Sequence, residues 1–163
     1  MAAMHVSQRE KEWQKKDIYY NRYLAIRYIT AVFFFANFWW LITLSMGKSL
    51  VAVVPLLLLI LSGPAIWEQK EKFHNSQNTI RKTELYYLIQ TLANVAFSFC
   101  YFTPLFRQLY PFLNQNGDEY LLTILLVGIL LAGFALQRAV KIAKDEDRYY
   151  LTIMRYQKKT TSH

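Results

Sequence analysis

The sequence predicts an all-α membrane protein with four transmembrane helices, and three observations support this prediction. Four segments contain no Asp, Glu, Lys or Arg: residues 28–47, 49–67, 85–106 and 120–137. They are 20, 19, 22 and 18 residues long, and about 20 apolar residues in a helix cross a hydrocarbon core about 30 Å thick. The charged residues all lie between or beyond these segments.

The 163 residues are the length of one domain, which divides into three regions. Residues 28–141 are expected to form the four-span bundle, and residues 142–163 a cytoplasmic tail with an apolar side. Residues 1–27 are expected to form a cytoplasmic interfacial segment, because residues 5–27 contain no Gly or Pro and mix basic with aromatic side chains. Its expected contacts with anionic lipid are made by Trp13, Lys15, Lys16, Arg22 and Arg27.

Lys and Arg are distributed unevenly among the segments that flank the spans. Six precede the first span, four lie between the second and third, and seven follow the fourth, whereas Lys48 and Arg107 stand alone in the other two connections. Cytoplasmic segments carry such an excess of basic residues. Both termini and the 68–84 connection are therefore predicted to be cytoplasmic. Tails rich in Lys, Tyr and Asn are typical of a low-GC bacterium, so we expect a bacterial plasma membrane.

This distribution also accounts for the net charge of +8, and no nucleic-acid partner is expected.

The connections predict several local features. Residues 47–49 are so short a link that the first two spans must form an antiparallel hairpin. Pro55 predicts a kink in the second span, and Gly63 with the proline after it predicts a break near its end. Thr83, followed by Glu84, is expected to cap the third span.

Polar residues recur every three or four positions along the third span, which places them on one helical stripe. In hydrocarbon such groups seek partners on other helices, each contact contributing about 0.5–2 kcal/mol. We expect the stripe to hold the bundle together; the alternative is a ligand site or permeation path centred on Asn94. The stripe comprises Tyr87, Gln90, Thr91, Asn94, Ser98 and Tyr101, with Asn37 of the first span as a candidate partner.

Small residues cluster in the fourth span, where they would let another helix approach closely. They are Gly128, Ala132, Gly133 and Ala135. Packing within the chain is the default interpretation. The alternative is an interface with another membrane protein or with a second copy of this chain.

Candidate catalytic and metal-ligating residues are scarce. No span contains an ionisable Asp, Glu, His, Lys or Arg, which argues against proton-coupled transport and intramembrane acid chemistry. His74 lies in a polar connection with no nucleophile or second ligand in a recognisable arrangement, so we expect a solvated side chain. The single Cys100 excludes an intramolecular disulfide and is expected to be a packing residue. No catalytic residue, metal ligand or cofactor is predicted.

Three classes of function are compatible with these observations. The first, which we expect, is a non-enzymatic accessory protein that docks on a larger membrane complex, such as a transporter, a secretion machine or a target that it protects. Its partner would be another integral membrane protein or a second copy of this chain. The second is a small oligomeric channel or transporter that uses the third-span stripe. The third is an enzyme that acts on lipid headgroups, with His74 as its base.

Overall fold

The computed structural model describes residues 2–71, 80–114, 117–144 and 146, with side chains described from residue 21 onward. Within these ranges the chain contains helices and no strand, which confirms the all-α prediction. The elements are α1 (Ala2–Met46), the 3-10 turn η1 (Leu50–Ala52), α2 (Val53–Glu71), α3 (Arg81–Cys100), α4 (Leu105–Leu109) and α5 (Asp118–Ala143).

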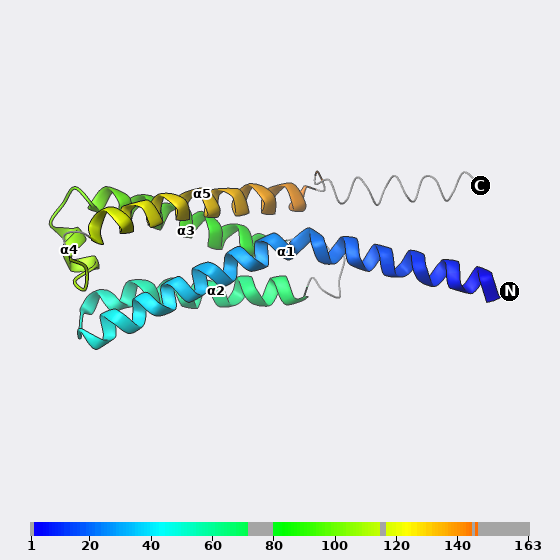
Figure 1. Ribbon diagram of the computed structural model, residues 1–163, viewed down its shortest axis with the longest axis horizontal. Coiled ribbons are helices and arrows are strands. Elements are labelled where there is room, and N and C mark those ends of the chain that lie inside the picture. Colours follow the sequence, from blue (N-terminus) through cyan, green and yellow to red (C-terminus); the bar gives the residue numbers. More distant parts are fainter. Residues whose placement is uncertain (1, 72–79, 115–116, 145, 147–163) are drawn as a thin grey trace.

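The long helices form two antiparallel hairpins, α1 with α2 and α3 with α5, which lie side by side (Figure 1). Contacts of α2 with α3 and of α1 with α5 join the hairpins. Figure 1 shows α4 at one end of the bundle and the N-terminal part of α1 running on beyond the other. We call these the α4 end and the tail end; the tail end is where α2 and α5 finish and α3 begins.

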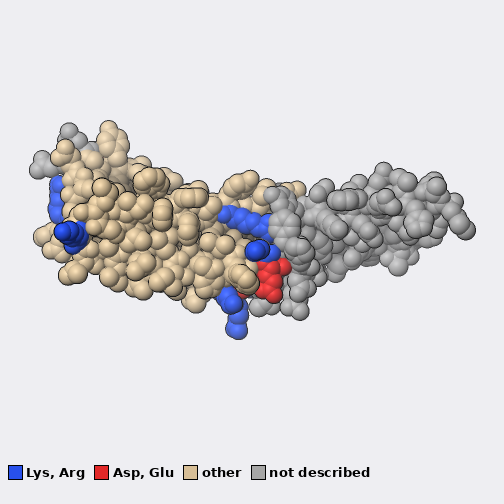
Figure 2. Space-filling view, turned by 90° about the horizontal axis from the view of Figure 1, so that it is seen from below, with Lys and Arg blue, Asp and Glu red and all other residues tan. Residues whose placement is uncertain are grey.

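Three stretches are long and apolar enough to cross a membrane: Asn21–Met46, Leu50–Glu71 and Asp118–Ala143. On the face seen in Figure 2, the described charged residues leave a broad band free between them. These features indicate an integral membrane protein. The fourth predicted span corresponds to α3, which is not among the three, because its first turn is charged and polar residues line one of its faces.

α1 is a single helix of 45 residues, about 68 Å long at 1.5 Å per residue. Residues 5–27 are therefore helical, but they continue the helix of the first span instead of forming a helix of their own. Their placement at the headgroup level stays a prediction.

The link between α1 and α2 forms the predicted tight hairpin. Lys48 adopts a positive φ of 50°, and the Ser49 amide donates to the Leu44 carbonyl at 3.0 Å. The Ser49 hydroxyl then accepts from the Val51 amide at 3.3 Å, which starts η1. The chain thus reverses within three residues.

The predicted break in the second span was wrong, and the position of Pro55 removes the reason for a kink there. Pro55 lies in the first turn of α2, where backbone amides have no partner inside the helix, so a proline there requires no kink. α2 also passes through Gly63 and Pro64 without a break and continues to Glu71. The helix tolerates the one backbone N–H that Pro64 lacks. The polar residues 68–71 consequently belong to α2 and not to a loop.

The third span is shifted relative to the prediction, since α3 begins at Arg81 and ends at Cys100. Pro104 disfavours the helical conformation in the residue before it, and the Thr103 hydroxyl donates to the terminal Cys100 carbonyl at 2.8 Å. The chain then forms α4, and Leu109 and Tyr110 turn back into the bundle, where both are buried.

Two apolar clusters fill the interior, one toward the tail end and one at the α4 end. In the second cluster the Trp40 indole donates to the Leu109 carbonyl at 3.1 Å and stacks on Tyr110, with ring centroids 5.1 Å apart. Burial raises the pKa of the Tyr110 phenol well above its ordinary value. Cys100 is partly buried in the same cluster.

Candidate functional site

The buried centre of the bundle contains a chain of side-chain amides. The Asn37 amide of α1 donates to the Gln90 side chain of α3 at 3.2 Å. The Gln90 amide in turn donates to the Asn94 side chain at 3.3 Å. All three residues are buried. The structure thus brings Asn37 together with the middle of the third-span stripe and connects α1 to α3 within the apolar interior.

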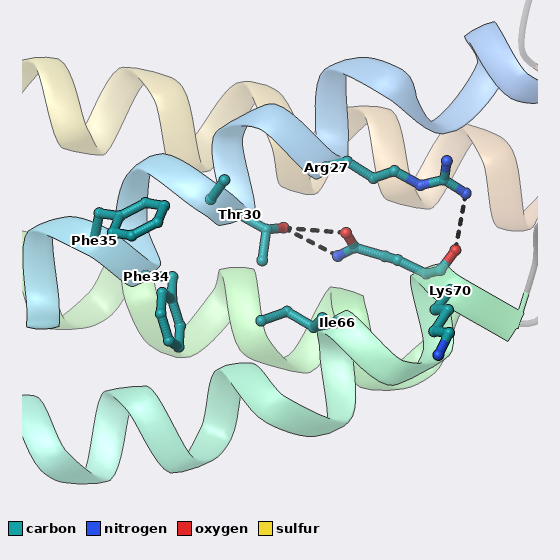
Figure 3. A pocket seen from close by; sticks show the side chains of 8 residues that line it. Arg27, Thr30, Phe34, Phe35, Ile66 and Lys70 are labelled. Carbon is teal, nitrogen blue, oxygen red and sulfur yellow. Dashed lines mark hydrogen bonds between the residues drawn. The ribbon is translucent and has the colours of Figure 1, made fainter.

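One turn toward the tail end, Tyr87 lies at the centre of a second polar group. Its hydroxyl donates to the Ile26 carbonyl at 2.7 Å and lies 2.7 Å from the Thr30 hydroxyl. The Gln69 amide donates to the same Thr30 hydroxyl at 3.0 Å (Figure 3). This group joins α1, α2 and α3 through residues that are all buried.

The remaining stripe residues do not extend this network to other helices. The hydroxyls of Thr91 and Ser98 donate to carbonyls of their own helix, at Tyr87 and Asn94. Tyr101 packs edge-on against Phe106, with ring centroids 5.3 Å apart, in the apolar cluster at the α4 end. Within the stripe, Tyr87, Gln90 and Asn94 therefore form the buried polar network, whereas Tyr101 packs in the apolar cluster at the α4 end.

Sequence reasoning missed Thr30 and Gln69 as members of the polar interior. Thr30 stands seven residues before Asn37, which is two helical turns and therefore the same face of α1. That spacing could have identified it. Gln69 could not be found in this way, because the sequence assigned it to the connection after the second span.

Most of the small residues of α5 face inward. Ala132 and Ala135 are fully buried in the core near the tail end. A Cβ added to Gly128 would come within 2.8 Å of the Asn94 side-chain nitrogen, so this glycine lets α5 approach α3. Apart from its chain neighbours and the backbone of its own helix, a Cβ added to Gly133 would meet no atom of the described residues within 4 Å. Of the four residues, Gly133 is thus the one with open space beside it.

At the tail end, the carboxylate of Glu68 caps the beginning of α3. It accepts from the Thr83 amide and the Thr83 hydroxyl, both at 2.8 Å, and from the Lys82 amide at 3.3 Å. A negative charge is favourable at a helix N-terminus, where amides lack partners within the helix. The predicted cap by Thr83 was wrong, because Thr83 lies inside the first turn and donates to the cap.

Two arginines of α1 meet the last turns of two other helices. The Arg22 guanidinium donates to the Ile142 carbonyl of α5 at 3.0 Å, and the Arg27 guanidinium donates to the Gln69 carbonyl of α2 at 2.9 Å. Carbonyls at a helix C-terminus lack partners within the helix and carry a partial negative charge. Arg22, Arg27 and Glu68 form what we call the charged layer, in which each helix end meets a side chain of opposite charge from another helix.

The charged layer changes the interpretation of the residues expected to contact lipid. Arg22 is only 1% exposed, so its guanidinium lies in the interior and satisfies a helix end instead of a headgroup. Arg27 is partly buried and lies at the edge of a surface groove. The side chains of Trp13, Lys15 and Lys16 lie outside the described residues, as does His74.

Comparisons of the chain with protein-family models, curated proteins and solved structures find no match.

Proposed function

We propose that this protein is a non-enzymatic accessory subunit of a larger complex in a bacterial plasma membrane. In this proposal α3 is the fourth transmembrane helix, and both termini and the connection after α2 are cytoplasmic, so the tail end faces the cytoplasm. The excess of Lys and Arg in these segments supports that orientation. The subunit acts by docking, and the polar interior serves to hold its own helices together.

One observation carries this proposal: the polar side chains of the interior are paired with one another. Gln90 bridges Asn37 and Asn94, and Thr30 lies between Tyr87 and Gln69. A permeation path or a ligand site needs polar groups directed at a solute. Here the strongest candidates for that role contact each other, which favours a rigid bundle that works through its outer surface.

The outer face of α5 offers a place for a partner helix. Leu130 and Phe134 are exposed there, and Gly133 on the same helix has open space beside it. Small residues on a transmembrane helix permit close approach of another helix. The partner in this proposal is an integral membrane protein that packs against this face.

The N-terminal part of α1 offers a second contact. Residues 2–20 continue the helix beyond the bundle (Figure 1), over about 28 Å at 1.5 Å per residue. In the proposed orientation this extension lies on the cytoplasmic side, where it can reach a soluble part of the partner complex.

The test is a purification of the tagged full-length protein from its native membrane in mild detergent, followed by mass spectrometry. We expect a larger membrane protein to co-purify in a fixed ratio. Gly133→Leu should reduce the recovered partner severalfold while the bundle keeps its thermal stability. Leu88→Ala, an exposed apolar change on α3, is the control and should retain the partner. Recovery of the wild-type chain with nothing attached would contradict the proposal.

A further inference from the structure

A groove of about 450 Å³ opens between α1 and α2 near the tail end. Its floor is formed by Thr30 and Gln69, which are buried and bonded to each other. Phe34, Phe35 and Ile66 supply its apolar walls. The floor therefore contains polar groups that already have partners, and the walls can receive an apolar guest.

The groove is polar at one end and apolar at the other. Figure 3 shows Arg27 and Lys70 at the end nearest the finish of α2, with Phe34 and Phe35 at the opposite end. Arg27 and Phe34 are seven residues apart on α1, which corresponds to about 10 Å along the helix axis. A guest must therefore carry negative charge at one end and an apolar body at least this long.

The groove also opens on the surface that faces lipid. Both of its helices contain candidate membrane spans, and Phe35 and Ile66 on its walls are 58% and 41% exposed. Its basic end lies beside the end of α2 at Glu71, where the apolar stretch finishes. With α2 crossing the bilayer, the two cations would lie at the depth of lipid headgroups and the aromatic walls at the depth of acyl chains.

Neighbouring groups hold both cations at the basic end. The Arg27 guanidinium is fixed by its 2.9 Å bond to the Gln69 carbonyl. The Lys70 ammonium lies 5.7 Å from the centre of the Trp67 ring, which is exposed in the manner of an interfacial anchor. A guanidinium and an ammonium at one site are well suited to bind the oxygens of a phosphate.

We propose that this groove binds one anionic phospholipid of the leaflet at the tail end. The phosphate lies between Arg27 and Lys70, and one acyl chain runs past Ile66 along Phe34 and Phe35. Charge complementarity selects an anionic headgroup, and the apolar walls select a lipid over a soluble phosphate. This binding site is independent of the partner face on α5.

The charge requirement is tested with the full-length protein released from nanodiscs of equimolar phosphatidylglycerol and phosphatidylcholine, using native mass spectrometry to count bound lipid. The wild-type chain should retain one phosphatidylglycerol in preference to phosphatidylcholine. Lys70→Gln should lower that retention about fivefold, the effect of one basic residue at an anionic surface. Lys141→Gln removes an exposed charge near the same end but outside the groove, and should leave retention unchanged.

The shape requirement is tested separately with Ala31, an exposed residue that lines the groove. Ala31→Phe fills the groove without changing its charge and should abolish lipid retention. Ala36→Phe, at an exposed position on the same helix outside the groove, should not. The proposal is overturned if the wild-type chain retains both lipids equally, if Ala31→Phe retains phosphatidylglycerol normally, or if the protein appears as a lipid-free dimer.

Discussion

At the scale of single residues, Glu68 is a nearly buried carboxylate surrounded by three donors of one helix terminus. Glu68→Gln keeps a side chain of similar shape but removes the charge that interacts with the α3 dipole. We expect a loss of about 1 kcal/mol in the free energy of unfolding. Reversible unfolding in mixed detergent micelles measures this loss. Glu71→Gln changes an exposed carboxylate in the same turn of α2 and serves as the control; equal losses for both variants would contradict a capping role.

Asn94 separates the two interpretations of the polar stripe. Asn94→Leu leaves the Gln90 amide without its acceptor, so we expect the bundle to lose about 0.5–2 kcal/mol of stability. Solute flux in proteoliposomes should stay at the level of the wild-type protein. Thr91→Val removes a hydroxyl that bonds only within α3 and should change stability less. A changed flux with unchanged stability would instead support a permeation path.

At the scale of elements, α5 contains two glycines in different environments. An added side chain at Gly128 would collide with the buried Asn94, whereas Gly133 has open space beside it. We expect Gly128→Leu to destabilise the bundle by about 1–3 kcal/mol through overpacking. Gly133→Leu should leave stability close to that of the wild-type protein. Thermal unfolding in one detergent compares the two directly, and similar melting temperatures would show that α5 does not pack closely on α3 at Gly128.

The sequence predicted most of the helices because a charge-free stretch of membrane length has few other structures available. It misplaced the C-terminus of α2 and the N-terminus of α3. The charged residues there are helical, so α2 continues to Glu71 and α3 already begins at Arg81, where Glu68 caps it. The break at Gly63 was wrong because a single proline removes one bond and packing retains the rest. Gln69 was missed because its bond to Thr30 depends on how far α2 extends and how the helices are rotated, which composition does not encode. Thr30 could have been found from its spacing to Asn37 on the same face of α1.

At the scale of the whole molecule, the proposed topology is that of four spans with both termini in the cytoplasm. The test uses a Cys100→Ala background and single cysteines introduced at three exposed positions: Lys48, Gln108 and Lys144. In intact cells a membrane-impermeant thiol reagent should label Lys48→Cys and Gln108→Cys, and should label Lys144→Cys only after the membrane is opened. Protection of Gln108→Cys in intact cells would show that α3 does not cross the membrane.

The polar face of α3 also bears on how the chain is built during synthesis. Its side chains find their partners on α1, and Gly128 of α5 lies against Asn94. Before α5 has been synthesised, the face of α3 that carries Asn94 therefore lacks its covering helix, and its amide group would face hydrocarbon. Stable integration of α3 should consequently wait for α5, so that the second hairpin enters the bilayer as a pair after the first has already been placed.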